Sequence, residues 1–327
     1  MSLDADYIVD RRRLRRKLTF WRVFAIVVAI AALGALAAAL TDTDRLAGGP
    51  TSGQIARVTI SGLIRGDRER SEALEDLGKS GVRAVIVHVD SPGGTTAGSE
   101  QLHDSLRRLA EKKPMVVVVD GMAASGAYIA AMASDHIVAM DTSLVGSIGV
   151  LFQFPNFYDL LKTLGVKVEE VKSSPLKAAP NGFEPTSPEA LAALEAIVKD
   201  SYAWFRGLVQ NRRHIEGEAL DRVADGRVFT GRQALELKLV DEIGNERAAI
   251  DWLAKAKNID PNTKVRDYRL RSRFNQLSFL HLGAAVALDP VGLHSFARQM
   301  EETGTLQAID RLDLDGLLAL WHPATTN

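Results

Sequence analysis

PMVVVVDGMAASGAYIAA, residues 114–131, decides the fold class of this chain. Residues 114–120 form a nearly continuous apolar run, which is typical of a β-strand that is covered on both faces. The small residues from Gly121 to Gly126 then allow a tight turn, and we expect a short helix to begin at Ser125. A buried strand that passes through a glycine-rich turn into a helix predicts an α/β unit.

The same alternation of strand and helix continues on both sides of this stretch. Alternating elements of this kind indicate an α/β fold with a largely parallel sheet. Beyond about residue 260 the pattern weakens, although LDGLLALW, 314–321, predicts a short helix that packs on the core, on a neighbour or on the membrane. The sequence predicts strands over 55–64, 82–90, 136–140, 145–150 and 166–172, helices over 69–80, 97–112 and 157–165, a long helix from Ser187-Pro188-Glu189 to about Arg213, and a turn with more helix over 225–253.

The N-terminus predicts a membrane anchor. Residues 1–22 include RRRLRRK, and they are followed by 18 residues without a charge, 23–40. At 1.5 Å per residue an apolar helix of that length spans roughly 27 Å, close to the hydrocarbon core of a bilayer. The basic flank favours the cytoplasmic side, so we expect a single pass through the inner (cytoplasmic) membrane, a linker over 41–54 and the rest of the chain outside. The alternative is a cleaved signal peptide, although its apolar region is usually shorter than this run.

The composition excludes several kinds of chemistry. The chain has 327 residues, of which 46% are hydrophobic and 25% charged, as in ordinary folded proteins. It has no cysteine, which excludes disulfides, thiolate catalysis and cysteine metal sites. Its net charge of −1 gives no basic bias, so we expect no nucleic-acid partner. No metal or cofactor is implied.

Two glycine-rich loops follow neighbouring buried strands, one at Asp90–Gly94 and one at Gly121–Gly126. Such loops open at the same edge of a parallel sheet, where α/β folds bind ligands. If Ser125 attacks a carbonyl group, the N–H of Gly126 and an N–H from Gly93 or Gly94 are placed to hold the oxyanion. The alternative is that the small residues only allow a helix and the sheet to pack closely.

A serine nucleophile needs a base, and no histidine lies within ten residues of Ser125. His136 is expected at the far edge of the sheet, His103 on the solvated side of a helix, and His88 in the core or in a supporting position. The histidines at 214, 281, 294 and 322 adjoin no motif.

A neutral lysine is an alternative base, because burial lowers the pKa of an amine, and serine–lysine dyads are an established variant of the catalytic triad. Lys177 lies in SSPLKAAP, a loop stiffened by two prolines, and Lys172 lies just before it. The residues alone do not choose between the two lysines.

A set of motifs occurs in one order along the chain: Asp90-Ser91-Pro92-Gly93-Gly94, Ala124-Ser125-Gly126, Gly146-Ser147-Ile148-Gly149-Val150, and Lys177 with Pro180. Together with GRVFTGRQALELKLVDEIG, 226–244, they resemble the signal peptide peptidase SppA family of membrane-anchored serine proteases. The resemblance covers about residues 55–255. It implies a ClpP/crotonase-like fold in a protease domain over 55–260, preceded by the transmembrane helix, with a C-terminal extension of unclear role over 261–327.

The resemblance also implies roles for individual residues. Ser125 is the nucleophile, Lys177 is the general base, and Ser147 orients the lysine. Gly93, Gly94 and Gly126 then form the oxyanion hole. Members of the family form ring- or dome-shaped homo-oligomers whose sites face inward, with the lysine often donated within the chain.

The function that the resemblance implies is a membrane-anchored serine endopeptidase that cleaves remnant signal peptides and other apolar, membrane-derived peptides. Two alternatives are a crotonase-like acyl-CoA enzyme and a non-catalytic membrane scaffold. The sequence departs from the family pattern at three positions. Ala127 and Lys238 stand where glycine is usual, and His88 stands where arginine is common.

Overall fold

The computed structural model describes residues 21–22, 52–270 and 318–320. The chain divides into two compact units, Met1–Gly49 and Pro50–Asn327, and the described fold belongs to the second. The predicted anchor over 23–40, nearly all of the basic N-terminus and most of the linker lie outside the described residues. None of the helices in the described part of the chain combines the length and the apolar character needed to cross a membrane.

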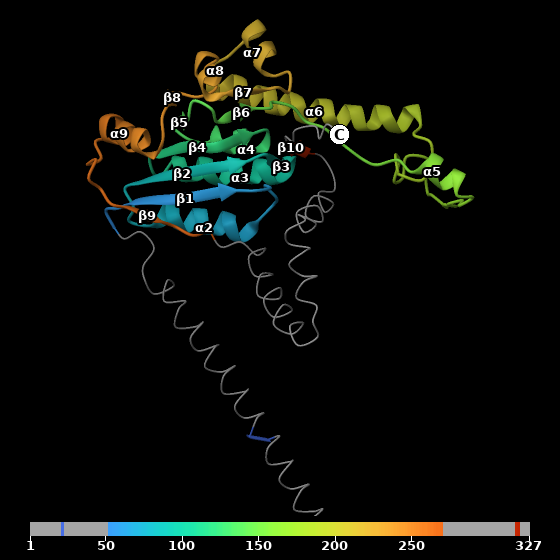
Figure 1. The fold of residues 1–327 in the computed structure, drawn as a ribbon, viewed down its shortest axis with the longest axis horizontal. Helices are drawn as coiled ribbons and strands as arrows, with labels where there is room; N and C mark the ends of the chain where they lie inside the picture. The colour runs from blue at the N-terminus through green and yellow to red at the C-terminus, as the bar shows by residue number, and fades with distance from the viewer. Residues whose placement is uncertain (1–20, 23–51, 271–317, 321–327) are drawn as a thin grey trace, which may run out of the picture. The chain divides into compact units, whose positions relative to one another are not determined.

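Within the described residues, an eight-stranded sheet forms the centre of the second unit (Figure 1). Its strands follow the order β7-β6-β4-β2-β1-β9, and β5 pairs with both β4 and β8. Only β6 and β7 pair antiparallel in this sheet of described strands, so the expected α/β fold with a largely parallel sheet is confirmed. The strands are β1 (Ile55–Ser61), β2 (Ala84–Ser91), β4 (Met115–Ala124), β5 (His136–Ala139), β6 (Leu144–Gly146), β7 (Val228–Thr230), β8 (Glu242–Ile243) and β9 (Val265–Asp267).

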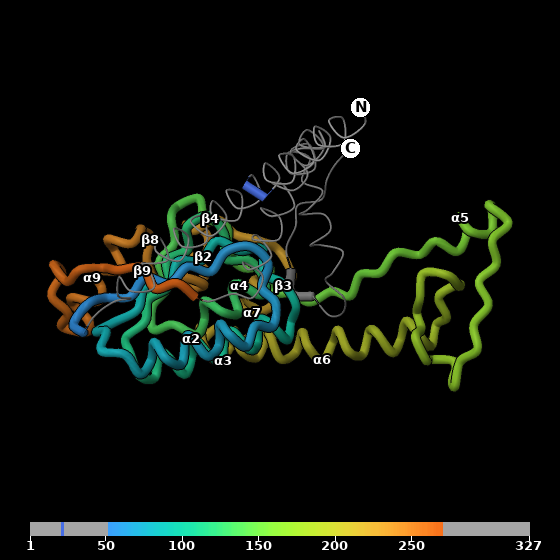
Figure 2. Tube along the Cα trace, turned by 90° about the horizontal axis from the view of Figure 1, so that it is seen from below, coloured from blue at the N-terminus to red at the C-terminus, as the bar shows by residue number. Residues whose placement is uncertain are grey.

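Helices cover both faces of the sheet because its central strands are apolar on both sides. In β2, Val85 and Val87 belong to the core cluster that includes α2, α3 and α4, whereas Ala84 and Ile86 belong to the cluster that includes α9. Figure 2 shows α2 and α3 running along the same side of the sheet. These helices are α2 (Arg68–Lys79), α3 (Thr96–Ala110), α4 (Gly126–Ala131) and α9 (Glu246–Lys257).

Residues 151–187, called the arm from here on, extend away from the sheet in both views (Figures 1 and 2). The arm carries α5 (Tyr158–Thr163), and none of its residues is buried. The strand predicted over 166–172 is wrong, because this segment has alternating valines but no strand to pair with among the described residues. Val171 is fully exposed there.

The helix that follows the arm, α6 (Pro188–Arg213), returns the chain to the core. It begins as predicted, with the Ser187 hydroxyl accepting a hydrogen bond from the Ala190 amide at 3.1 Å. Phe205 and Val209, near its C-terminus, are buried in the core. The shorter helices after it are α7 (Gly217–Val223) and α8 (Gly231–Glu236).

Two strands lie after residue 260, where the sequence pattern is too weak to predict them. Strand β9 pairs with β1, so the sheet extends past residue 260, where the protease domain was expected to end. Strand β10 (Leu318–Leu320) pairs antiparallel with β3 (Gly93–Thr95) in a separate two-stranded sheet. The prediction of a helix over 314–321 is therefore wrong for residues 318–320. The other residues from 271 onward lie outside the described residues.

Candidate active site

Ser125 lies where β4 ends and α4 begins, in a strained backbone conformation. Its φ is 55° and its ψ is −118°, a combination that L-residues rarely adopt and that costs roughly 1–3 kcal/mol. Ser125 follows the part of β4 that pairs with β6, since Val116–Val119 pair with β5 and Met122–Ala124 pair with β6. A serine on a strained turn between a strand and a helix is the geometry of a nucleophile elbow.

The backbone around Ser125 is held on both sides. Its amide donates to the Gly146 carbonyl at 2.7 Å, and its carbonyl accepts from the amides of Tyr128 and Ile129. The residue is only 1% exposed. Its hydroxyl does not cap α4 and has no hydrogen-bond partner among the described residues. The hydroxyl is therefore positioned by the backbone and is not engaged by a structural contact.

The glycine loop after β2 lies against the same helix, since Ser91 pairs with Ala123 and β3 contacts α4. The Ile64 amide donates to the Gly93 carbonyl at 2.8 Å, and the Thr95 amide donates to the Ile64 carbonyl at 2.9 Å. Because successive peptide groups of a strand point in opposite directions, the N–H and C=O of Gly94 face away from Ile64.

Both positions require glycine, Gly93 because of its backbone conformation and Gly94 because of a close contact. Gly93 has a φ of 101°, in the left-handed region that favours glycine. A Cβ atom on Gly94 would lie 1.8 Å from the Ile64 carbonyl oxygen. The Gly93 amide donates to the Ser91 hydroxyl at 3.1 Å. The amides of Gly94 and Gly126 therefore suit an oxyanion better than the amide of Gly93.

Ser147 is brought close to Ser125 by the pairing of β4 with β6. It directly follows Gly146, whose carbonyl holds the Ser125 amide. Ser147 has a φ of 52° and is 7% exposed, and its amide donates to the Arg227 carbonyl at 2.8 Å. Its hydroxyl has no hydrogen-bond partner in the described part of the chain. Of the predicted site residues, Ser125, Ser147 and the three glycines are thus gathered at one end of the sheet.

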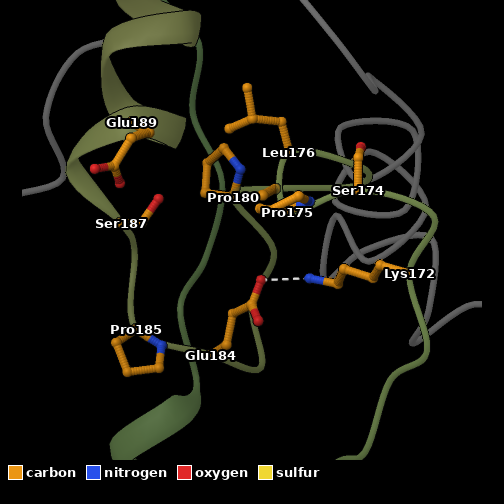
Figure 3. Close-up of a pocket in the computed structure, with 10 residues that line it drawn as sticks. Lys172, Ser174, Pro175, Leu176, Pro180, Glu184, Pro185, Ser187 and Glu189 are labelled. Carbon is orange, nitrogen blue, oxygen red and sulfur yellow. Dashed lines mark hydrogen bonds and ion pairs between the residues drawn. The ribbon is translucent and has the colours of Figure 1, made fainter.

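Lys177 is not part of this group. It lies on the arm and is exposed, and the only hydrogen bond that it makes with described residues runs from its amide to the Ser174 carbonyl at 3.0 Å. Beside it on the arm is a pocket of about 720 Å³, lined by Leu176, Pro180 and residues on both sides of them (Figure 3). Among the residues that the structure describes, no lysine contacts the Ser125 hydroxyl, and the dyad stays a prediction.

Lys172, the other candidate base, is held in ion pairs. Its Nζ lies 2.8 Å from Glu170 Oε2. It also lies 2.5 Å from Glu184 Oε1, the ion pair marked in Figure 3. Hydrogen bonds to these two carboxylates raise the pKa of Lys172 above its usual value. A base must be able to lose its proton, so these ion pairs disfavour Lys172.

The histidines of the described residues make structural contacts away from Ser125. His88 lies between carboxylates, with Nδ1 3.0 Å from both oxygens of Asp120 and Nε2 2.8 Å from Glu246. His136 stacks on Trp252, with 4.7 Å between ring centroids.

His103 was expected to be solvated, but this prediction is wrong. The residue is 8% exposed, because α3 is packed between neighbouring elements, α2 and α4 among them. Burial lowers the pKa of His103, and its Nε2 has no partner among the described residues. Within the same residues, no group of three or more histidine, aspartate or glutamate side chains is arranged to hold a metal ion.

Comparison with known proteins assigns the chain to a family. The model of peptidase family S49 matches residues 107–260. A protein of Synechocystis sp. that is named as a protease, slr0021, is 36% identical over 214 residues, which cover 65% of this chain and 77% of that protein. The chain belongs to peptidase family S49. It is a serine protease of the SppA type.

Other relatives in the S49 family are longer. Protease 4 of Haemophilus influenzae is 30% identical over 236 residues, covering 69% of this chain and 38% of that protein. A protein of Enterococcus faecium named as the signal peptide peptidase SppA is 32% identical over 185 residues, covering 56% of this chain and 54% of that protein. The chain thus spans about half or less of the length of these two relatives. Similar solved structures include the membrane-bound stomatin-specific protease 1510-N, with a TM-score of 0.41 and 14% identity over 67% of this chain and 99% of that chain.

Proposed function

We propose that this S49 protein is a membrane-anchored endopeptidase with a ClpP/crotonase-like fold, in which Ser125 is the nucleophile and Lys177 the general base. The observation that carries the proposal is the strained backbone of Ser125, which has a φ of 55° and whose hydroxyl has no hydrogen-bond partner among the described residues. Strain of this kind persists where the surrounding structure imposes it, and it is concentrated at active sites.

The chemistry is that of an acyl-enzyme. The Ser125 hydroxyl attacks a peptide carbonyl carbon while a neutral Lys177 amine accepts the hydroxyl proton. The amides of Gly94 and Gly126 donate hydrogen bonds to the oxyanion, and each such donor contributes roughly 3–4 kcal/mol to lowering the barrier. The lysine then returns the proton to the leaving amine, and water hydrolyses the ester. Ser147 supports the lysine through its hydroxyl, and no cofactor takes part.

A second copy of the chain is the source of the lysine in this proposal. Large apolar side chains on the arm and on the first half of α6 are exposed, and a lone chain leaves them in water: Phe157, Leu160, Leu164, Val166, Val168, Val171, Leu176, Phe183, Leu191 and Ile197. An apolar surface of this kind usually marks an interface. In a homo-oligomeric ring, an arm that packs on the next copy would carry Lys177 toward that copy's Ser125.

The location and the substrates follow from the N-terminus. The apolar run over 23–40 and the basic RRRLRRK before it favour a single-pass anchor in the inner membrane, with the protease domain on the outer, periplasmic side. A protease held at that surface meets remnant signal peptides and other apolar segments released from the membrane. We expect it to cleave beside small, apolar side chains.

Mixing two inactive variants tests both the dyad and the source of the lysine. Ser125→Ala and Lys177→Ala should each lose hydrolysis of a fluorogenic apolar peptide, whereas Lys172→Ala, the matched control, should keep it. If the lysine comes from a neighbour in a ring, co-assembled Ser125→Ala and Lys177→Ala chains should recover about one quarter of the parent activity, because a quarter of the sites then combine an intact serine with an intact lysine.

Three results would count against the proposal. Activity in folded Ser125→Ala would exclude the nucleophile, and activity in folded Lys177→Ala would exclude the base. If the mixed chains recover nothing although they co-assemble, the lysine is not shared between copies.

A further inference from the structure

A basic pocket lies where the C-terminal end of α6 meets the loop between α8 and β8. Its volume is about 330 Å³. The polar residues that line it are Arg212, Arg213, His214, Lys238 and Asp241. Three permanent cations face a single carboxylate, so the lining has an excess of two positive charges before His214 is counted. A hollow of this charge attracts anions.

The carboxylate in the pocket is already neutralised. Arg213 donates to both oxygens of Asp241, from Nη2 at 2.7 Å and from Nη1 at 3.2 Å. The Lys238 amine and the His214 ring, in contrast, form no hydrogen bond or ion pair with any described residue. The charge that is left without a partner in the pocket is therefore positive.

Arg212 also lacks a countercharge. Its Nε donates to the Met132 carbonyl at 2.7 Å, and its Nη2 donates to the Ser134 carbonyl at 2.8 Å. These acceptors are neutral, and none of the described carboxylates forms an ion pair with this guanidinium. Burial and the nearby charge of Arg107 lower the pKa of Arg212. An anion in the pocket would supply the missing charge.

The backbone at the pocket adopts left-handed conformations at two of its basic residues. The φ of Lys238 is 60° and the φ of His214 is 55°. This conformation is costly for residues other than glycine, and such costs are concentrated at functional sites. The resemblance to the SppA family predicts glycine at position 238, which would adopt the same φ without strain. Lysine at this position therefore adds a cation to the pocket at the expense of stability.

We propose that this pocket binds a phosphate group. Phosphate offers several acceptor oxygens to donors on different sides, here the end of α6 and the loop after α8. A phosphate monoester carries between one and two negative charges at neutral pH, which matches the excess charge of the lining. The group can belong to a small phosphorylated molecule or to a phospholipid headgroup. The proposal does not rest on the peptidase reaction, since Ser125 and Lys177 take no part in it.

The pocket is connected to the candidate nucleophile through α4, which begins directly after Ser125. Arg212 bonds to carbonyls at the C-terminal end of this helix. The Tyr128 hydroxyl, within α4, donates to the Leu239 carbonyl at 2.8 Å, one residue after Lys238. A ligand that holds both walls of the pocket should therefore suppress local opening of α4. The pocket would act as an effector site that stabilises the helix behind the nucleophile.

Isothermal titration of the full chain in detergent micelles with inorganic phosphate tests the proposal. We expect saturable binding with a dissociation constant of about 1 mM or lower, because the pocket supplies two or three charge-assisted hydrogen bonds. Lys238→Met should weaken binding at least about tenfold, since it removes one such bond, whereas Lys238→Arg should retain binding. Lys255→Met removes an exposed lysine in the last turn of α9 and is the matched control. It should bind phosphate like the parent.

Further probes identify the source of the phosphate. Glycerol 3-phosphate carries a phosphate monoester, and glycerophosphoglycerol carries the phosphodiester of a lipid headgroup. Tighter binding of the monoester indicates a small phosphorylated molecule, and equal or tighter binding of the diester indicates a phospholipid. Acetate should bind at least about tenfold more weakly than phosphate, because it has one charge and two oxygens.

Hydrogen exchange reports on the connection to α4. Saturating phosphate should slow exchange of the amides of residues 128–134 in the parent but not in Lys238→Met, and unchanged exchange in a phosphate-bound parent would overturn the effector role. The site itself is overturned if phosphate does not bind at up to about 20 mM, or if acetate or the Lys238→Met chain gives equal affinity. Failure of the proposed peptidase would appear separately, as a parent chain that binds phosphate but cleaves no peptide.

Discussion

Replacing Gly94 with alanine should disable the oxyanion loop, and the structure gives the size of the effect. A Cβ atom at this position would lie 1.8 Å from the carbonyl oxygen and 2.6 Å from the carbonyl carbon of Ile64, which are backbone atoms that cannot rotate away. Restoring ordinary contact requires β3 to move by roughly 1.5 Å. A displacement of about 1 Å in a reacting group can cost about 10²-fold in rate, and loss of one oxyanion donor costs about 10²–10³-fold.

We therefore expect Gly94→Ala to lower kcat by about 10²–10³-fold, which corresponds to about 2.7–4 kcal/mol. The assay is hydrolysis of a fluorogenic apolar peptide, with thermal unfolding recorded for the same samples. Gly66→Ala is the matched control, because the nearest atom to its Cβ would be Gln101 Oε1 at 3.4 Å, the end of a flexible side chain. Its kcat should stay close to that of the parent.

The reasoning would be refuted by a folded Gly94→Ala protein with a kcat within about threefold of the parent. If the variant does not fold, Ser91→Ala is a milder test of the same loop. The buried Ser91 hydroxyl accepts from the Gly93 amide at 3.1 Å and donates to the Gly62 carbonyl at 2.6 Å. Its removal should lower stability by about 1–3 kcal/mol and also lower kcat.

Three further outcomes are expected. Ser125→Gly should abolish activity yet be about 1 kcal/mol more stable to urea than Ser125→Ala, because glycine adopts a φ of 55° without strain; equal stabilities would argue against strain. Lys238→Gly should raise stability by about 0.5–1 kcal/mol in thermal unfolding, since Lys238 has a φ of 60°; a lower melting temperature would contradict this. The hydrogen bond from Arg57 lowers the pKa of Glu246 in the folded protein. This interaction therefore stabilises the fold at pH values above the ordinary glutamate pKa of about 4.5, and the stabilisation is lost as the pH falls through the lowered pKa of Glu246. Arg57→Gln should therefore have a lower free energy of unfolding than the parent at pH 7, and the difference should narrow below about pH 4. A difference that does not change with pH would exclude this role of Glu246.

The sequence predicted the central sheet well because its strands are nearly continuous apolar runs. Val85–Val89 and Val116–Val119 are long enough to be recognised without knowing their partners, and the helix start at Ser187 has a local chemical cause in its capping hydroxyl. The tight turn at Ser125 was also predictable, because tight turns require small residues, although the loop expected from Gly121 is wrong as far as Ala124, where β4 continues.

The elements that were missed depend on distant partners. Strand β3 is only Gly-Gly-Thr and has no periodicity, and it becomes a strand because Ile64 and residues 318–320 lie on its two sides. The segment 166–172 shows the opposite case, an alternating pattern that pairs with no strand of the described residues. The separation of Lys177 from Ser125 was equally hidden, because no local pattern indicates that the arm leaves the domain.

The strand order determines which fragments of this protein can keep a complete sheet. The segment that matches the family model begins at residue 107, whereas β1 and β2 precede it and β9 follows residue 260. A recombinant fragment cut to the matched region would lose the neighbour of β4 on the β2 side and leave a row of unpaired N–H and C=O groups along the middle of the sheet. Such an edge readily pairs with other chains, so the fragment would be prone to aggregate. The smallest segment that keeps the sheet complete runs from Ile55 to Asp267, and expression trials should start from those limits.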